Sequence, residues 1–325
     1  MANPNEQVAE QSPKASKVII AVNTPDGVGY FVDSEGRFLF KKQFEKVSKF
    51  TEGLACVKQN DKWGFINTKG EVVIPCIYDG AGYFHKGLAR VEQNDKWGFI
   101  NTKGEVVIPC IYDEADWFSE GLASVEQNCK WGFINTQGEV VIPCIYDNAV
   151  SFSEGLALVK QNCKWGLINT KGEVIVPCIY DDAENFSEGL ACVKQNGKRG
   201  FINTKGEVVI PCIYDRAWSF SEGLADVEQN GKYGFINTKG EVVIPCIYES
   251  AGVFSEGLSI VKKNGKWGFI NTKGEVVIPC IYDFARHFSK GLAPVEQNGK
   301  WSVINTEGKV IVADFNSTSW SVVEL

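Results

Sequence analysis

The sequence contains little histidine and no paired cysteine motif, and both shortages limit the chemistry that the chain can perform. Of its 325 residues only two, His85 and His287, are histidines. No Cys-x-x-Cys pair occurs, so the ligand spacing typical of a structural zinc site is missing. The sequence therefore predicts no metal site.

The sequence motifs of common enzyme classes are also lacking. There is no Gly-x-Ser-x-Gly elbow, Walker loop, His-Glu-x-x-His segment or dinucleotide-binding glycine fingerprint. The neighbouring carboxylates Glu114, Asp116, Asp182 and Glu184 are typical of an acidic, solvated rim rather than of a general base. We therefore predict no catalytic residue, no cofactor and no enzymatic activity.

An excess of basic residues and a long apolar run are lacking as well. The formal net charge of −7 argues against general nucleic-acid binding, which needs a basic face that neutralises phosphates. The longest apolar run, Val-Val-Ile-Pro-Cys-Ile-Tyr, is far shorter than the roughly 20 residues of a membrane helix, so membrane insertion is not expected. Residues 1–16 are polar and carry no secretion or lipidation signal. We expect a disordered leader there and a single β-repeat domain at 17–325.

Cysteine is plentiful, but its spacing does not suggest disulfide pairs. Seven of the eleven cysteines recur every 34 residues, at Cys76, Cys110, Cys144, Cys178, Cys212, Cys246 and Cys280. Such copies could pair only if neighbouring repeats brought them within disulfide reach. We interpret the column as small buried hydrophobic residues. Free thiols in this number predict a reducing, cytoplasmic location.

Repetition dominates the rest of the sequence. Aligned on the Phe of Gly-Phe-Ile-Asn-Thr, equivalent positions recur every 34 residues at Phe31, Phe65, Phe99, Phe133, Leu167, Phe201, Phe235, Phe269 and Val303. This register defines nine repeats without insertions. The first and last are atypical, because Gly29 replaces Trp and Ser302 replaces Gly, as is common in terminal repeats.

Each repeat is expected to form a small antiparallel meander. Residues 87–94 and 96–101 predict two strands joined by an Asn-Asp turn, and residues 105–112 predict a third strand that follows a turn at Gly104. A short fourth strand is expected around Phe118, before Gly121 turns the chain. Apolar residues on both sides of the hairpin predict that neighbouring sheets cover both of its faces.

A recurring glutamate distinguishes between ways of stacking the repeats. In a parallel β-helix its copies would form an acidic ladder at a spacing of about 4.8 Å. Self-contained antiparallel sheets separate the copies by about 10 Å, which relaxes the repulsion. We therefore predict an all-β, propeller-like toroid of nine antiparallel meander units, with strand-like segments at 17–22 and 319–325. An open superhelix of the same units is the alternative. The column is Glu71, Glu105, Glu139, Glu173, Glu207, Glu241 and Glu275.

The repeated Lys-Trp-Gly phrase resembles the bacterial WG-repeat family, also called KWG repeats. The resemblance covers residues 28–312 and includes the recurring Phe-Ser-Glu-Gly-Leu-Ala segment; Arg199 and Tyr233 depart from it by replacing Trp. It implies a β-rich repeat architecture and a general interaction role, without shared catalytic residues. The pairs that carry it are Trp63-Gly64, Trp97-Gly98, Trp131-Gly132, Trp165-Gly166 and Trp267-Gly268.

Candidate functional positions are those at which the repeats differ. The three x positions of Tyr-Asp-x-Ala-x-x-Phe vary, and so does the position after the strand alanine, from Cys56 to Pro294. A core position could not accept Arg, Asp, Trp and Gly in turn without large losses of stability, so we expect these columns to face solvent or a partner. Trp, Tyr and Arg also dominate interaction hot spots. The candidate partner-binding residues are Tyr83, Arg90, Asp116, Trp117, Arg216, Trp218, Asp226, Arg286 and His287.

The sequence thus predicts a cytoplasmic, non-enzymatic scaffold that presents a variable polar and aromatic face to a protein partner. Drift of unconstrained columns would produce the same variation. A carbohydrate-binding, lectin-like protein with equivalent pockets between units is the alternative, and self-assembly into fibres through the end repeats is a third possibility. A lectin needs the same pocket in most repeats, whereas a scaffold uses unlike residues. The repeated Trp is interpreted as a packing residue rather than a sugar-stacking one.

Overall fold

The computed structural model describes residues 19–40 and 43–315. All helix or strand elements assigned in these residues are β-strands. The predicted all-β class is therefore confirmed. In these ranges no helix is long and apolar enough to cross a membrane. The leader predicted at 1–16 and the strand-like segment at 319–325 lie outside the described residues.

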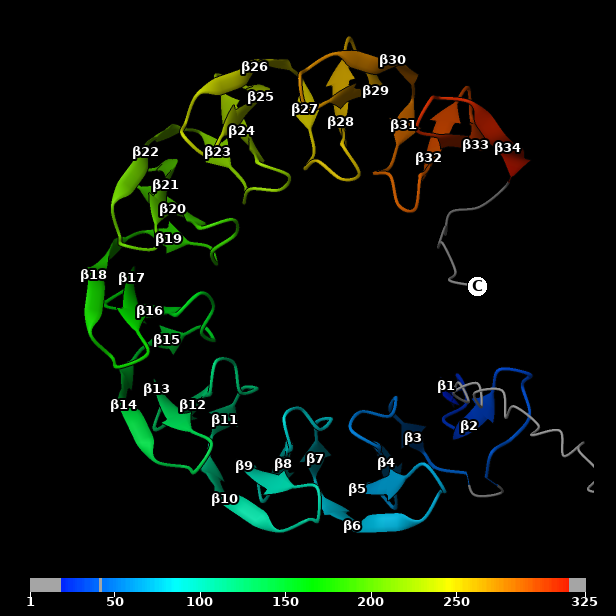
Figure 1. The fold of residues 1–325 in the computed structure, drawn as a ribbon, viewed down its shortest axis with the longest axis vertical. Coiled ribbons are helices and arrows are strands. Elements are labelled where there is room, and N and C mark those ends of the chain that lie inside the picture. Colours follow the sequence, from blue (N-terminus) through cyan, green and yellow to red (C-terminus); the bar gives the residue numbers. More distant parts are fainter. Residues whose placement is uncertain (1–18, 41–42, 316–325) are drawn as a thin grey trace, which may run out of the picture. The chain divides into compact units, whose positions relative to one another are not determined.

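The strands of the described residues form one two-stranded sheet and eight four-stranded antiparallel sheets, and each of these strands pairs only with strands of its own sheet (Figure 1). The two-stranded sheet contains β1 (Ile19–Asn23) and β2 (Gly29–Asp33). The first four-stranded sheet contains β3 (Lys46–Val47), β4 (Leu54–Gln59), β5 (Lys62–Asn67) and β6 (Val72–Tyr78), and the second contains β7 (Gly80–Ala81), β8 (Leu88–Gln93), β9 (Lys96–Asn101) and β10 (Val106–Tyr112). The third contains β11 (Glu114–Ala115), β12 (Leu122–Gln127), β13 (Lys130–Asn135) and β14 (Val140–Tyr146).

The remaining five sheets repeat the same pattern. They contain β15 (Asn148–Ala149), β16 (Leu156–Gln161), β17 (Lys164–Asn169), β18 (Val174–Tyr180); β19 (Asp182–Ala183), β20 (Leu190–Gln195), β21 (Lys198–Asn203), β22 (Val208–Tyr214); β23 (Arg216–Ala217), β24 (Leu224–Gln229), β25 (Lys232–Asn237), β26 (Val242–Tyr248); β27 (Ser250–Ala251), β28 (Leu258–Lys263), β29 (Lys266–Asn271), β30 (Val276–Tyr282); β31 (Phe284–Ala285), β32 (Leu292–Gln297), β33 (Lys300–Asn305), β34 (Val310–Phe315).

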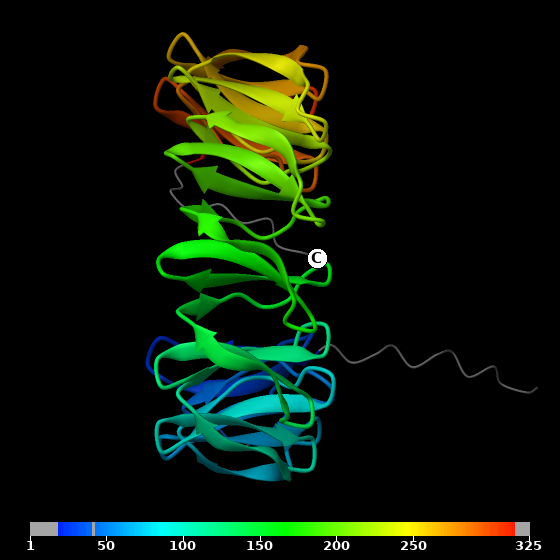
Figure 2. The same cartoon turned by 90° about the vertical axis from the view of Figure 1, so that its left-hand side faces the viewer.

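The array divides into two compact parts within the fourth sheet, β11–β14. The first part holds the described residues up to Phe118 together with Ala123–Cys129 and Phe133–Val140. The second holds Ser119–Leu122, Lys130–Gly132 and the described residues from Val141 onward. Within the second part, Figure 2 shows the sheets β15–β18 and β19–β22 lying one above the other.

A short strand begins each four-stranded sheet. The sequence predicted such a strand around Phe118, at the end of the preceding meander, and this position is wrong. The strand lies at Glu114–Ala115, where it pairs with β12 and so opens the next sheet. Phe118 follows it in a loop, where its buried ring packs 4.8 Å from the ring of Phe99. The backbone thus starts a new sheet while this side chain still fills the core of the old one.

Both turns of the meander match the predicted turn chemistry. Asn94 and Asp95 have φ of 54° and 58°, the left-handed region that a two-residue type I′ hairpin requires. Gly104 has φ of 84° and ends the second turn, in which the side chain of Asn101 accepts hydrogen bonds from the backbone of Lys103 and Glu105. The Asn101 amide also donates to Glu105 at 2.6 Å. The recurring glutamate therefore has an amide partner within its own hairpin.

The glycine of each Trp-Gly pair is required by the neighbouring edge strand. The β9–β10 ladder is irregular between Ile108 and Tyr112, and there the edge strand passes directly over Gly98. A Cβ atom at Gly98 would lie 2.5 Å from the Ile108 carbonyl oxygen and 2.7 Å from the Cys110 nitrogen, closer than such contacts allow. Because these neighbours are backbone atoms, no rotamer change could relieve the clash.

The atypical residues of the terminal repeats fit this explanation. In the last sheet Ser302 stands at the glycine position and pairs with Ala313. The edge strand β34 there lacks the Pro-Cys step that accompanies the irregularity in the other repeats. Tyr30 takes the glycine position in the first repeat, where the described strands form only the two-stranded sheet. The glycine is thus replaced where the Pro-Cys edge strand is missing.

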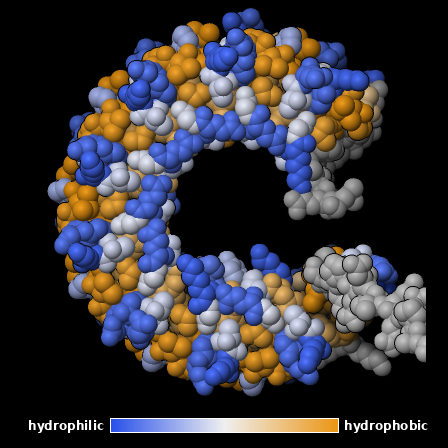
Figure 3. Space-filling model, viewed as in Figure 1, coloured by the Kyte–Doolittle hydropathy of each residue, from blue (hydrophilic) through white to orange (hydrophobic). Residues whose placement is uncertain are grey.

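The prediction that both hairpin faces are covered holds for the central strands and fails for the edge strands. Phe99 and Ile100 point to opposite faces and are 1% and 0% exposed. On the edge strand β10, however, Val106 is 60% and Ile111 48% exposed. Hydrophobic surface recurs on the side of β18, β22 and β26 (Figure 3). A proline in each of these strands removes a ladder donor, which opposes edge-to-edge pairing.

Polar side chains connect consecutive sheets in both parts of the array. In the first part, Asp113 pairs with Lys96 of the preceding sheet and accepts a hydrogen bond at 2.8 Å from the backbone of Asn128 in the next. In the second part, Glu120 accepts from the backbone of Gly155 at 2.9 Å, and the Ser119 hydroxyl donates to the Phe152 carbonyl. The recurring Asp and Ser-Glu segments therefore fix one sheet on the next.

None of the eleven cysteines, all of which lie among the described residues, forms a disulfide bond. The seven recurring ones are half-buried rather than fully buried as predicted, because they lie on the edge strands. The thiol of Cys110 donates to the Val91 carbonyl of its own sheet at 3.6 Å, and burial raises its pKa.

Candidate binding pockets between sheets

The column that follows the strand alanine is buried, so the expectation that it faces solvent is wrong. Cys192 is 0% exposed, Ile260 5% and Asp226 4%, and Arg90 is half-buried. Asp226, for example, lies opposite the core residue Phe235 in the ladder. This column borders the space between one sheet and the next. The space accepts unlike side chains because the residues of the next sheet that face the column also differ from repeat to repeat.

Arg90 shows how one such space is filled. Its guanidinium lies 4.8 Å from the ring centre of Trp97 and 5.1 Å from that of Trp117, between two aromatic walls. Its Nη1 donates to the Ala115 carbonyl at 2.7 Å. Trp117 also stacks on Tyr83, with ring centres 4.4 Å apart. Three of the predicted partner-binding residues are therefore brought together, and they pack against one another across consecutive sheets.

The second and third variable positions are coupled between successive repeats, which sequence reasoning missed. A Cβ atom at Gly82 would lie 2.2 Å from the ring of Trp117, and one at Gly252 would lie 2.4 Å from the ring of His287. Glycine at the second position thus accommodates a ring at the third position of the next repeat. The Ser219 hydroxyl donates to Glu184 at 3.3 Å in the same arrangement. Comparing each second position with the third position 35 residues later would have revealed this pairing.

The remaining candidates differ in exposure. Asp116 is half-buried and accepts a hydrogen bond from the Ser124 hydroxyl at 2.9 Å. Arg216 is exposed, and its Nε lies 3.4 Å from Glu228. Arg286 and His287 are exposed, although the His287 ring loses solvation beside Gly252, which lowers its pKa. The repeated Trp is half-buried, and Trp97 serves as a wall for Arg90, which agrees with a packing role.

Three pockets lie at equivalent places between consecutive sheets of the second part. Each is lined by the second variable position of one repeat, by the residue in the Trp column, and by Ala and two variable residues of the next repeat. We name them the Glu184 pocket (Glu184, Arg199, Arg216, Ala217, Trp218), the Asp226 pocket (Trp218, Asp226, Tyr233, Ala251, Gly252, His287) and the Ile260 pocket (Gly252, Ile260, Trp267, Phe284, Arg286, His287).

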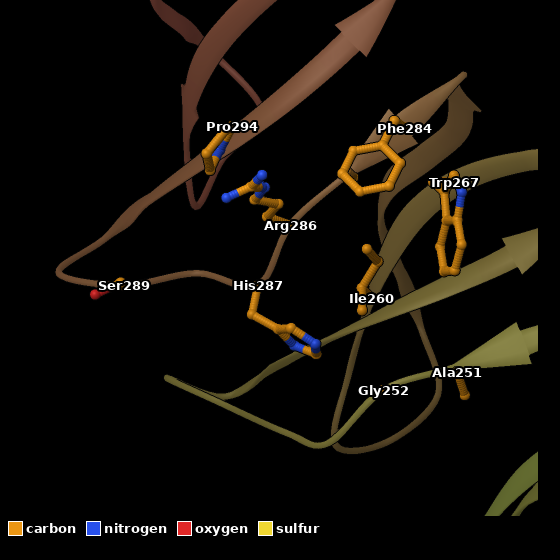
Figure 4. Close-up of a pocket in the computed structure, with 10 residues that line it drawn as sticks. Ala251, Gly252, Ile260, Trp267, Phe284, Arg286, His287, Ser289 and Pro294 are labelled. Carbon is orange, nitrogen blue, oxygen red and sulfur yellow. The ribbon is translucent and has the colours of Figure 1, made fainter. Parts of the chain in front are cut away.

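The linings of these pockets differ in chemistry. The Glu184 pocket, of 230 Å³, is charged, because Arg199 replaces Trp and pairs with Glu184 at 2.6 Å and Asp182 at 2.7 Å. The Ile260 pocket, of 570 Å³, is mostly apolar. Figure 4 shows Ile260, Trp267 and Phe284 on its walls, with His287 directed toward Ile260. Equivalent places in the repeats therefore offer different surfaces to a ligand.

The Asp226 pocket combines an acid with aromatic side chains. Its volume is 330 Å³, and the rings of Trp218 and Tyr233 lie 5.9 Å apart. Burial raises the pKa of Asp226 to about 7, an effect to which the charge of Glu184 adds. Asp226 Oδ1 is buried without a hydrogen-bond partner among the described residues. Such a group is costly to leave unsatisfied, so this carboxyl favours a donor entering the pocket.

The fold defined by these observations is a tandem array of four-stranded antiparallel meanders. The profile of the WG-containing repeat matches eight successive segments, at 31–63, 63–97, 97–131, 131–165, 165–198, 200–233, 233–267 and 267–301. The chain therefore belongs to the WG-repeat family, as the sequence resemblance predicted. No curated protein matches the chain.

A solved structure of low sequence identity has a similar fold. This structure, described as "Crystal structure of the eukaryotic initiation factor", is 10% identical, covers 93% of this chain and 96% of its own, and has a TM-score of 0.52. Two further matches have lower TM-scores. "KlHsv2 with loop 6CD replaced by a Gly-Ser linker" is 9% identical over 69% and 92% of the two chains, with a TM-score of 0.38. "Dihydro-heme d1 dehydrogenase NirN in complex with DHE" is 10% identical over 94% and 75%, with a TM-score of 0.36.

Proposed function

We propose that this chain is a non-enzymatic scaffold that binds a protein partner through the row of pockets between its sheets. One observation carries the proposal: equivalent pockets are built on the same repeated backbone but are lined by unlike residues. Pockets that differ along an array suit a partner that offers a different group to each of them. A sheet array fixed by hydrogen bonds between repeats also loses little entropy when it binds.

The unlike linings argue for a protein rather than a glycan as the partner. A lectin with equivalent sites would need similar residues in most pockets, whereas these three are charged, acidic-aromatic and apolar in turn. Adjacent pockets also share residues: Trp218 lines the first two, and Gly252 and His287 line the last two. An extended polypeptide could therefore contact all three in sequence.

Affinity capture from cytosol tests this function. The intact chain is compared with a variant that carries Arg216→Ala, Trp218→Ala and Arg286→Ala, all on pocket linings. A matched control carries Lys103→Ala, Lys171→Ala and Lys239→Ala at hairpin turns. We expect one protein to be retained by the intact chain and by the control and lost by the pocket variant, with all three chains equally folded by circular dichroism.

The opposite result would redirect the assignment. If the pocket variant retains the same proteins as the intact chain, the pocket residues do not bind the partner. If neither retains a protein but both are retained on a glycan array, the lectin alternative replaces the scaffold. A cytoplasmic location remains a prediction, and the choice of cytosol as the source of partners depends on it.

A further inference from the structure

The Asp226 pocket is bordered by a buried acceptor atom that has no partner among the described residues. Asp226 is 4% exposed, yet its Oδ1 has no hydrogen-bond partner among the described residues and the residue lines an open pocket. Oδ1 retains acceptor capacity in both the ionised and the neutral carboxyl, so without a donor this oxygen lacks a stabilising contact. The backbone N–H of Asp226 itself is the hydrogen-bond donor that acts on the carboxyl, and it lowers the pKa. A ligand that donates a hydrogen bond to the Asp226 carboxyl would supply the missing contact.

The Arg90 site of the first part shows which ligand fits such a place. Arg90 and Asp226 occupy the same column, and the Arg90 guanidinium lies between two rings while it donates to the Ala115 carbonyl. Cys192, also in this column, donates to the equivalent Ala217 carbonyl at 3.5 Å. The equivalent alanine of the Asp226 pocket is Ala251, which lines it. The ionised Asp226 carboxylate has no proton to donate to a carbonyl, so in this state the column supplies no donor to Ala251.

We propose that the Asp226 pocket binds a primary alkylammonium group, namely the side-chain ammonium of a lysine on the protein partner. The Trp218 and Tyr233 rings would face the cation, as Trp97 and Trp117 face Arg90. An ammonium with three donors can bond the Asp226 carboxylate, which a quaternary ammonium cannot. The proposal rests on the scaffold function, because it names the group that a partner presents to one pocket.

The charges around Asp226 set the pH dependence of this binding. Glu184 of the preceding sheet repels the ionised carboxylate. Tyr233, in the same sheet as Asp226, lines the pocket near the Arg216–Glu228 pair. His287 also lines the pocket, beside Gly252, and desolvation lowers the pKa of its ring. With Asp226 titrating near pH 7, the ionised fraction rises about tenfold from pH 6 to pH 8. The affinity for an ammonium should rise about tenfold over the same range.

The test uses the full chain and small probes, so it does not depend on identifying a partner. The indole N–H signal of Trp218, assigned by its loss in Trp218→Phe, is followed in a ¹H–¹⁵N spectrum during titration with n-butylammonium chloride. At pH 8 we expect a saturable shift, at least tenfold weaker binding of 1-butanol and of trimethylbutylammonium, and about tenfold weaker binding of the amine at pH 6.

Two variants make the result specific. Asp226→Asn should lose at least tenfold in affinity and all of the pH dependence, whereas Asp116→Asn, a carboxyl that already has a partner, should leave both unchanged. Equal binding of butanol, full binding by Asp226→Asn, or no saturable shift would overturn the proposal. A melting curve for each variant shows whether it is folded under the conditions used.

A second pair of probes assigns the source of the ammonium. N-acetyl-lysine methylamide should bind like butylammonium, and the same compound acetylated on its side chain should not. If butylammonium binds and the lysine derivative does not, the assignment to a lysine side chain is wrong and the pocket accepts free amines. If capture succeeds while both amines fail, the scaffold function stands and this inference is wrong; if the amines bind but capture fails, the reverse holds.

Discussion

The Arg90 site and the Asp226 pocket occupy equivalent places in the array and have opposite contents. At Arg90 a cation from the chain lies between Trp97 and Trp117, and its Nη1 donates to the Ala115 carbonyl. At Asp226 an acid borders an open pocket, and its Oδ1 has no hydrogen-bond partner among the described residues. The difference teaches that one repeated backbone can yield either a space filled by the chain's own side chain or an open pocket, depending on a single column.

The largest effect is expected from Asp226→Asn as a function of pH. Because the folded pKa of about 7 lies above the ordinary value of 3.8, the folded chain holds this proton more tightly than the unfolded chain. Stability should therefore fall as the pH rises from about 4 to 7, by on the order of 4 kcal/mol. Asp226→Asn should remove this fall, as measured by hydrogen exchange in sheet β23–β26. A wild-type sheet whose stability is constant between pH 4 and 7 would contradict the prediction.

The next largest loss of stability tests whether the Arg90 site and the Asp226 pocket are built on the same backbone conformation. Gly98→Ala and Gly234→Ala should each destabilise their own sheet by about 3 kcal/mol, because the added methyl would lie 2.5 or 2.4 Å from an edge-strand carbonyl oxygen. Hydrogen exchange of the two sheets measures the losses separately. Ser302→Ala is the control and should change stability by less than about 0.5 kcal/mol. Unequal losses at the two glycines would show that the backbones differ as well.

Arg90→Met would remove the guanidinium from the Arg90 site while keeping most of the side-chain volume. It removes the contact of the cation with two indole rings and the hydrogen bond to the Ala115 carbonyl. The expected loss is about 1 to 2 kcal/mol, measured as a lower melting temperature. Arg90→Lys should recover part of it, because lysine restores the charge and a donor. If Arg90→Met melts like the wild type, the guanidinium does not stabilise this site.

The smallest loss of stability is expected from replacing Lys96, which precedes Trp97 of the Arg90 site, or Lys232, which precedes Tyr233 of the Asp226 pocket. Lys96 pairs with Asp113, whereas no ion pair of Lys232 occurs among the described residues. Both lysines are surface residues, so Lys96→Met should cost less than about 1 kcal/mol and Lys232→Met close to nothing. Lys96 and the backbone of Asn128 hold the pKa of Asp113 below its usual value. An NMR titration of Asp113 in Lys96→Met should therefore give a higher pKa; an unchanged one would mean that the pair does not form in solution.

Much of the fold could be predicted from the sequence because its signals are local. The Asn-Asp turn, the glycine at 104 and the alternating strands each specify a conformation without distant partners. The position of the short strand could not be predicted in this way. Glu114 and Ala115 carry no strand signal of their own and pair because β12 offers them a free edge. The exposure of Val106 and Ile111 was also missed, since alternation alone does not show which strand lies at an edge.

The candidate site could be predicted only in part, for a similar reason. Variation among repeats identified columns that line the pockets, but variation does not distinguish a solvent-facing position from one facing a changing neighbour. Asp226 and Arg90 were expected at the surface, and both border the space between sheets. The contact between Gly82 and Trp117 spans two repeats, so columns examined one at a time could not reveal it.

Each pocket is assembled from two consecutive repeats, and this has a genetic consequence. Duplication or loss of one 34-residue segment would preserve the turns and the strand pairing, because both form within each sheet. It would nevertheless join two half-pockets that had never been adjacent. Such a chain could acquire a new specificity by recombination between its own copies, without a single amino-acid substitution.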